Sequence, residues 1–165
     1  MRQLGYGEGE NIILEPRWTE GYQERLPSLA KELLDLKVAV IVTAATPASL
    51  AAKAATNTTP IVFVAVADPV SVGLVASLAR PGDNVTGLSL LTSDLSGKRL
   101  ELLREIVRNI SRVAILMNPD NESNTIFLKQ TQLAAQKLGI ELDASNARRP
   151  DEIEKAFAAA VRFWG

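Results

Sequence analysis

Three polar side chains stand directly before a proline, each after a run of β-branched and aliphatic residues that is typical of a buried strand. They are Thr46, Asp68 and Asn118. The carboxyl ends of parallel strands share one edge of a sheet, where open α/β folds bind their ligands. Helix N-termini at that edge offer free N–H groups to a carboxylate or a phosphate. We therefore predict an anion site at Thr46, Ala48 and Ser49, with Asp68 placed to meet an ammonium or hydroxyl group.

The same three side chains have a simpler interpretation as helix N-caps. Thr, Asp and Asn caps each stabilise a helix by about 1 kcal/mol, and proline favours the first helical turn. For any one of the three residues the sequence leaves both interpretations open. Polar loops that converge on one rim make a pocket, so the set as a whole favours a ligand cleft.

The composition argues against most familiar catalytic chemistry. The 165 residues include no Cys and no His, which removes thiolate catalysis, disulfides, the commonest general base and the commonest metal ligand. No Ser has a Lys, Asp or Glu in a recognisable catalytic pattern, and Asp68 with Asp120 is a poor candidate pair for acid–base work. We expect no enzyme activity, no metal and no cofactor.

Charge and glycine patterns argue against nucleic-acid and nucleotide binding. The 18 basic residues against 19 acidic ones give a net charge of −1, without the basic excess that phosphate backbones require. The glycines of residues 5–9 precede a predicted strand instead of following one, and residues 96–99 lack the upstream glycine of a phosphate loop. Trp18 either stacks on a ligand or packs against the following helix, and packing is the commoner role.

Strand and helix patterns alternate along the chain, which indicates βαβ units and parallel sheets. Strands are predicted over residues 11–15, 37–43, 61–66, 84–90, 112–117 and 140–143. Helices are predicted over residues 23–36, 47–56, 69–78, 96–109, 122–138 and 150–161. The runs 37–43, 61–66 and 112–117 are apolar throughout, as in strands covered on both faces. Residues 91–95 are the best candidate for a crossing between two lobes.

Several motifs, taken together and in order, resemble one protein family. The most specific is Arg80-Pro81-Gly82-Asp83-Asn84-Val85-Thr86-Gly87. Others are Leu4-Gly5-Tyr6, Arg17-Trp18-Thr19-Glu20-Gly21, Asp68-Pro69-Val70 and Ser96-Gly97-Lys98-Arg99-Leu100. Over nearly the whole chain the sequence is similar to the ABC-transporter substrate-binding proteins that include tryptophan- and phenylalanine-binding receptors and have the type I periplasmic-binding-protein fold.

The resemblance implies two flavodoxin-like α/β lobes, residues 1–92 and 93–165, that close on a small ligand. An amino acid would place its carboxylate near the helix N-terminus at Thr46 and its ammonium group near Asp68. The cleft-facing positions implied in this sequence are Thr46, Pro47, Ala48, Ser49, Asp68, Thr92, Ser93, Asn118, Ser123 and Asn124.

The resemblance also implies partners and a location. Such receptors deliver their ligand to a membrane permease driven by an ATPase subunit, outside the cytoplasm or in the periplasm. Family members begin with a signal peptide and a first strand and continue well past Gly165. We therefore expect a chain truncated at both ends, without a signal peptide or a membrane span, whose first lobe lacks a strand and whose second lobe is incomplete.

Two other functions stay open at this point. A flavodoxin-like enzyme would use the helix terminus at Thr46 for a phosphorylated ligand, although His, Cys and a phosphate loop are absent. A ligand-sensing domain of a transcription regulator shares the fold, although no helix-turn-helix or basic segment precedes it here.

Overall fold

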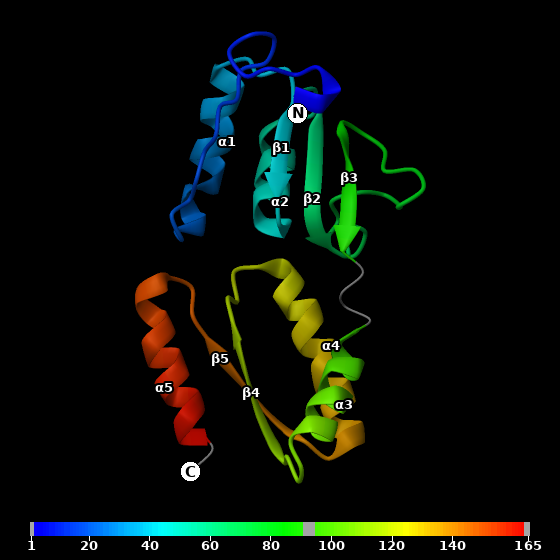
Figure 1. Ribbon diagram of the computed structural model, residues 1–165, viewed down its shortest axis with the longest axis vertical. Coiled ribbons are helices and arrows are strands. Elements are labelled where there is room, and N and C mark those ends of the chain that lie inside the picture. The colour runs from blue at the N-terminus through cyan, green and yellow to red at the C-terminus, as the bar shows by residue number, and fades with distance from the viewer. Residues whose placement is uncertain (1, 91–94, 164–165) are drawn as a thin grey trace.

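The computed structural model describes residues 2–90 and 95–163, which form two parallel α/β units (Figure 1). In the first, β1 (Ile41–Ala44), β2 (Ile61–Ala67) and β3 (Val85–Leu90) pair in the order β1-β2-β3. In the second, β4 (Arg112–Met117) pairs with β5 (Glu141–Asn146). We call residues 2–90 the first lobe and residues 95–163 the second lobe. The predicted boundary between residues 92 and 93 lies outside the described residues.

Helices flank both sheets. The first lobe contains the short η1 (Arg2–Leu4) and η2 (Gln23–Arg25), then α1 (Leu26–Asp35) and α2 (Thr46–Ala55). The second contains α3 (Ser96–Ile106), α4 (Glu122–Leu138), the short η4 (Pro150–Glu152) and α5 (Ile153–Phe163). The predictions for residues 47–56 and 122–138 are confirmed to within a residue, and Gly139 ends α4 with a φ of 68°. The other helices begin or end a few residues from their predicted positions.

The motif at residues 80–87 has a structural role. The side chain of Asn84 donates to the carbonyls of Thr59 at 2.6 Å and Thr56 at 3.3 Å, which ties the start of β3 to the loop before β2. Gly87 lies so close to Phe63 of β2 that any Cβ would overlap the Phe63 backbone. The motif therefore fixes how β3 joins the sheet.

Two predicted elements do not form. Residues 11–15 were expected to be a strand, but only an isolated bridge between Glu8 and Ile12 occurs there. Ile13 is 78% exposed and pairs with none of the described strands, and a strand needs a hydrogen-bonded neighbour. Residues 69–78 were expected to be a helix and instead form turns. Their first turn is closed by Gly73 at a φ of 71°, a left-handed conformation that a helix cannot continue through.

The prediction of a strand buried on both faces is wrong for residues 37–43. β1 begins only at Ile41, and its side chains alternate between buried and exposed. Val42 is 66% exposed because β1 is an edge strand whose second side has no neighbour among the described residues. In the second lobe β4 is also an edge strand, and Leu116 is 46% exposed.

Candidate functional site

The carboxyl ends of the two sheets face each other across the junction between the lobes (Figure 1). From the first lobe, β1 leads into the N-terminus of α2, and β2 leads into the turn at Asp68. From the second, β4 leads into residues 118–121 before α4, and β5 leads into residues 147–150. The predicted rim is thus built from both lobes.

A pair of buried hydroxyl groups joins the lobes at this junction. Thr46, the first residue of α2, is 2% exposed, and Ser123, in the first turn of α4, is 4% exposed. Their hydroxyl oxygens lie 2.6 Å apart, and the Ser123 hydroxyl lies 3.4 Å from the carbonyl oxygen of Ala67 at the end of β2. Gly21 also lies against the ring of Pro150.

The capping interpretation is wrong for Thr46. The N-cap of α2 is Ala45, which has a φ of 66° and caps the helix without a side chain. Ser49 supports this turn from below, because its hydroxyl bonds the Ala45 carbonyl at 2.8 Å and the Thr43 hydroxyl at 2.9 Å. Ser49 is 0% exposed, so it braces the turn and does not reach the surface in this conformation.

A pocket of about 500 Å³ opens beside the N-terminus of α2 and continues along the free edge of β1. Pro47 and Ala48 line it from α2, Trp18 from the loop before η2, and Asn121 from the second lobe. Its volume is in the range of small-molecule sites, and helix N-termini suit carboxylates. The arrangement can therefore hold a small molecule that has an anionic end and an apolar body.

Asp68 is engaged differently from the prediction. Its carboxylate accepts a hydrogen bond from the Ser71 amide at 3.1 Å, and its own backbone has a φ of 47°. Asp68 therefore holds a turn and caps no helix, since residues 69–78 form none, and it does not line the pocket beside α2. Thr92 and Ser93, predicted at the crossing, lie outside the described residues.

Asn118 and Asn124 order the loop that enters α4. The Asn124 side chain donates to the Asn118 carbonyl at 2.8 Å, and the Asn118 side chain accepts from the Asp120 amide at 2.9 Å. The Asn121 side chain caps α4 by accepting from the Ser123 amide at 3.1 Å. The predicted residues Asn118, Ser123 and Asn124 therefore belong to one connected loop.

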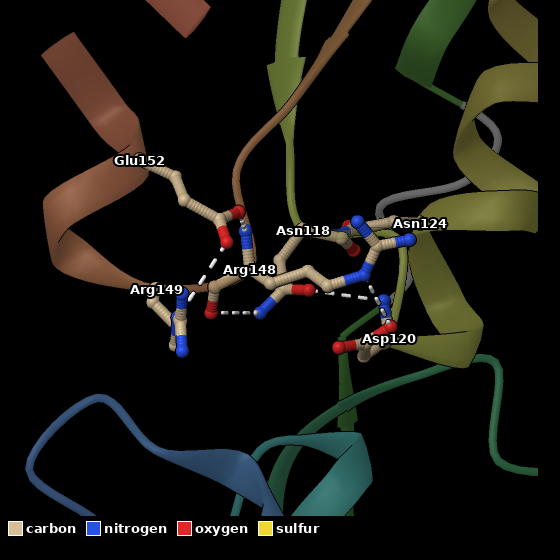
Figure 2. A network of polar contacts seen from close by, with 6 residues as sticks. All are labelled: Asn118, Asp120, Asn124, Arg148, Arg149 and Glu152. Carbon is tan, nitrogen blue, oxygen red and sulfur yellow. Dashed lines mark hydrogen bonds and ion pairs between the residues drawn. The ribbon is translucent and has the colours of Figure 1, made fainter. Parts of the chain in front are cut away.

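A second loop, after β5, is tied to the first (Figure 2). The Asn118 side chain donates to the Arg148 carbonyl at 3.3 Å, and the Arg148 guanidinium pairs with Asp120 at 3.2 Å. Glu152 accepts from the Arg148 amide at 2.9 Å and approaches the Arg149 guanidinium at 3.5 Å. The two loops of the second lobe thus form one braced rim.

A second pocket, of about 480 Å³, lies inside the second lobe between α3, α4 and β4. Apolar side chains such as Leu100, Leu103 and Phe127 dominate its lining, and Asn118 and Asn124 also border it. None of its lining residues comes from the first lobe. Asn118 and Asn124 thus border this pocket and not the one that holds Pro47 and Ala48.

Three features of the site were missed or misjudged from the sequence. Asn121 was not singled out, although its place before an acidic helical turn is a capping signal. Trp18 was expected to pack on the following helix, but it is 75% exposed and lines the pocket, so that expectation is wrong. No sequence pattern predicts the role of Arg148, because its partners Asn118 and Asp120 are 30 and 28 positions away.

Over residues 2–90 and 95–163, no three acidic side chains gather closely enough to hold a metal ion. In the same part of the chain, every helix is too short or too polar to cross a bilayer.

Comparison with known proteins gives consistent matches over almost the full chain. A family model described as ABC transporter substrate binding protein matches residues 1–162. A tyrosine-binding protein of Clostridioides difficile (strain R20291) is 30% identical over 162 residues, 98% of this chain. This chain spans about half the length of the curated relative it matches, 46%.

Solved structures show the same arrangement of lobes. The crystal structure of a conserved domain protein from Vibrio cholerae O1 biovar eltor is 34% identical with a TM-score of 0.88, covering 96% of this chain and 53% of that one. An ABC domain in complex with L-Trp from Streptococcus pneumoniae is 24% identical with a TM-score of 0.82, covering 95% and 54%. The predicted fold class, α/β lobes of a type I periplasmic binding protein, is confirmed.

Proposed function

Because this chain belongs to the ABC transporter substrate-binding protein family, we propose that it serves as a solute receptor that binds an amino acid between its two lobes. The observation that carries the proposal is the pocket beside the N-terminus of α2, which is lined mostly by the first lobe and also by Asn121 of the second lobe. A ligand there would touch both lobes and stabilise their closed arrangement.

The chemistry of the pocket supports an amino acid. In the first turn of α2, Pro47 has no N–H and the Ser49 N–H bonds the Ala45 carbonyl at 3.3 Å, which leaves the Ala48 N–H as the donor beside which a ligand carboxylate fits. The remaining lining is mostly apolar, which suits an aliphatic or aromatic side chain. Asp68 does not line this pocket, so its position does not support the predicted contact with the ammonium group.

The relatives support the same ligand class. One binds tyrosine by its description, and another was solved with L-Trp. We propose that the receptor works outside the cytoplasm or in the periplasm. There it would deliver its ligand to a membrane permease driven by an ATPase subunit. In that role it needs no catalytic residue.

We assign the first lobe to residues 1–92 and the second to 93–165. Among the predicted site residues, Thr46, Pro47, Ala48 and Ser123 are the best supported, because they lie at the junction or line the pocket beside α2. The phosphate-binding enzyme and the transcription regulator have no support among the matched proteins.

A thermal-shift panel tests the proposal. The protein is heated with L-amino acids, sugars and nucleotides, each at millimolar concentration. A ligand bound only by the folded state stabilises it by RT ln(1 + [L]/Kd), which is about 2.7 kcal/mol at a hundred times Kd. We expect stabilisation by one or more L-amino acids. Stabilisation by nucleotides or sugar phosphates alone would contradict the proposal.

A further inference from the structure

A buried hydroxyl group in the second lobe has no hydrogen-bond partner among the described residues. It belongs to Ser96, the first residue of α3, which is only 3% exposed. Buried polar groups in folded proteins are almost always hydrogen-bonded, and an unsatisfied one costs free energy. Ser96 also lines the pocket of about 480 Å³ between α3, α4 and β4. A molecule bound in this pocket can therefore supply the missing partner.

The other uncharged polar side chains of this pocket already have partners. The Thr131 hydroxyl donates to the Phe127 carbonyl at 2.7 Å. The Asn118 side chain both donates and accepts within the rim, and the Asn124 side chain donates to the Asn118 carbonyl. The hydroxyl of Ser96 differs from them because it can bind a ligand without giving up a bond.

Apart from this polar end, the pocket is apolar. α3 and α4 lie side by side, on the side of the sheet away from α5 (Figure 1). Leu100 and Leu103 line the pocket from α3, and Phe127 and Leu128 line it from α4. Side chains around an empty apolar space lack dispersion contacts on one side. An aliphatic chain restores these contacts, and the volume lies in the range of small-molecule sites.

The charge at the pocket selects the end group of the ligand. Arg99 lies three positions after Ser96 on α3 and lines the same pocket, with its guanidinium carbon 5.7 Å from the centre of the Phe127 ring. Of the described residues that line the pocket, none is acidic. A carboxylate can accept from the hydroxyl and pair with the guanidinium, whereas an ammonium group finds no anionic partner. The pocket therefore favours a carboxylate without an ammonium group, unlike an amino acid.

We propose that this pocket is a second ligand site, which binds a medium-chain aliphatic carboxylate. The carboxylate accepts a hydrogen bond from the Ser96 hydroxyl and pairs with Arg99, and the chain lies against Leu100, Leu103 and Phe127. The site shares no lining residue with the pocket beside α2. It goes beyond the proposed function, since neither site needs the other to be occupied.

Isothermal titration calorimetry with octanoate and 1-octanol, both below the concentration at which octanoate forms micelles, tests this site. Octanoate should bind saturably with one site per chain, and octanol about tenfold more weakly, because it lacks the charge. Ser96→Ala should weaken octanoate binding about tenfold. Ser89→Ala is the matched control and should leave it unchanged, since the Ser89 hydroxyl is also buried without a partner but lies on β3 outside both pockets.

Two further variants test the pocket without changing Ser96. Leu128→Trp fills the space between α3 and α4, so it should abolish octanoate binding without lowering the melting temperature. Arg99→Gln should weaken octanoate binding about threefold and leave octanol binding unchanged, because only octanoate carries a charge.

The outcomes separate this site from the proposed function. Equal octanoate binding by the wild type and either Ser96→Ala or Leu128→Trp would overturn the proposal. Competition between octanoate and L-phenylalanine would overturn it too, since both would then share one site. Absence of octanoate binding overturns it, and a dimer seen by light scattering would then assign the free edge of β4 to a second copy. If no amino acid stabilises the protein but octanoate binds, only the proposed function fails.

Discussion

The two lobes have the same parallel α/β plan but differ in how completely they are packed. The first has a core of eight buried apolar residues around β2, none more than 5% exposed. The second has four, of which Val113 is 9% exposed, and an open apolar pocket lies beside them. Side-chain hydrogen bonds are distributed the other way round. The second lobe, although its core is smaller, carries the network of Asn118 and Arg148 at its rim.

This difference shows that the two lobes can make different contributions to one site between them. The first lobe supplies a rigid wall, since the turn entering α2 is braced by the buried hydroxyls of Thr43 and Ser49. The second supplies a rim whose shape depends on side-chain hydrogen bonds, which individually contribute little to stability but set the positions of their partners. Four pairs of variants test this comparison.

The largest effect should come from equal truncations in the two cores. Leu74→Ala in the first lobe should lower the free energy of unfolding by about 4 kcal/mol, since Leu74 is 1% exposed and the site cannot collapse. Leu100→Ala in the second lobe should cost about 2 kcal/mol, because Leu100 already borders a pocket of about 480 Å³. Urea denaturation measures both, and equal losses would remove the packing difference.

A pair of glycine substitutions gives the next largest contrast. Gly87→Ala should destabilise the first lobe by about 3 kcal/mol, because the added Cβ overlaps Phe63 and pushes β2 and β3 apart. Gly97→Ala in α3 is the control, since its Cβ would lie 3.6 Å from that of Ala134, an ordinary contact. We expect it to be neutral or to stabilise by about 0.5 kcal/mol. A neutral Gly87→Ala would show that the sheet of the first lobe is not tightly joined.

The hydroxyl pair between the lobes should give a smaller, coupled effect. Thr46→Val and Ser123→Ala should each cost about 1 kcal/mol, because each leaves a buried hydroxyl with one partner fewer. In a double-mutant cycle the coupling energy should be at least about 0.5 kcal/mol. Additive losses would mean that the two lobes do not meet at these residues in solution.

The smallest effect should come from the rim. Arg148→Ala should cost about 0.5 kcal/mol at low salt and almost nothing in about 1 M NaCl, since its side chain is 54% exposed and pairs with Asp120 in solvent. Arg17→Ala is the counterpart in the first lobe, where the side chain is only 26% exposed and bonds Glu32 and Pro16. Its loss should be larger and less sensitive to salt.

Local patterns predicted the elements that local forces decide. The helix at residues 122–138 was placed correctly because Gly139 marks its end, and the structure adds Asn121 as the cap at its start. Residues 11–15 have a strand pattern but no neighbour to pair with, and residues 69–78 have a helical pattern that Gly73 interrupts. In both cases the deciding feature was a partner or a backbone conformation, not hydrophobic spacing.

The sequence predicts which residues follow the ends of the strands. It does not predict which of these residues contact each other. The positions of Thr46 and Asn118 at a common rim followed from the parallel topology, and Ser123 was implied by the family resemblance. That Thr46 and Ser123 bond each other, 77 positions apart, depends on how two lobes approach. The same holds for Trp18, whose exposure could not be deduced from its neighbours in the sequence.

The central claim is that one ligand contacts both lobes at the junction. Titration of the ¹⁵N-labelled protein with L-phenylalanine, followed by backbone amide chemical shifts, tests it most directly. We predict saturable shifts at Ala48 and Ser49 of α2 and also at Asn121 and Ser123 of α4, with one dissociation constant for all four. Shifts confined to the pocket of the second lobe around Leu103 and Phe127, or no shifts at all, would contradict the claim.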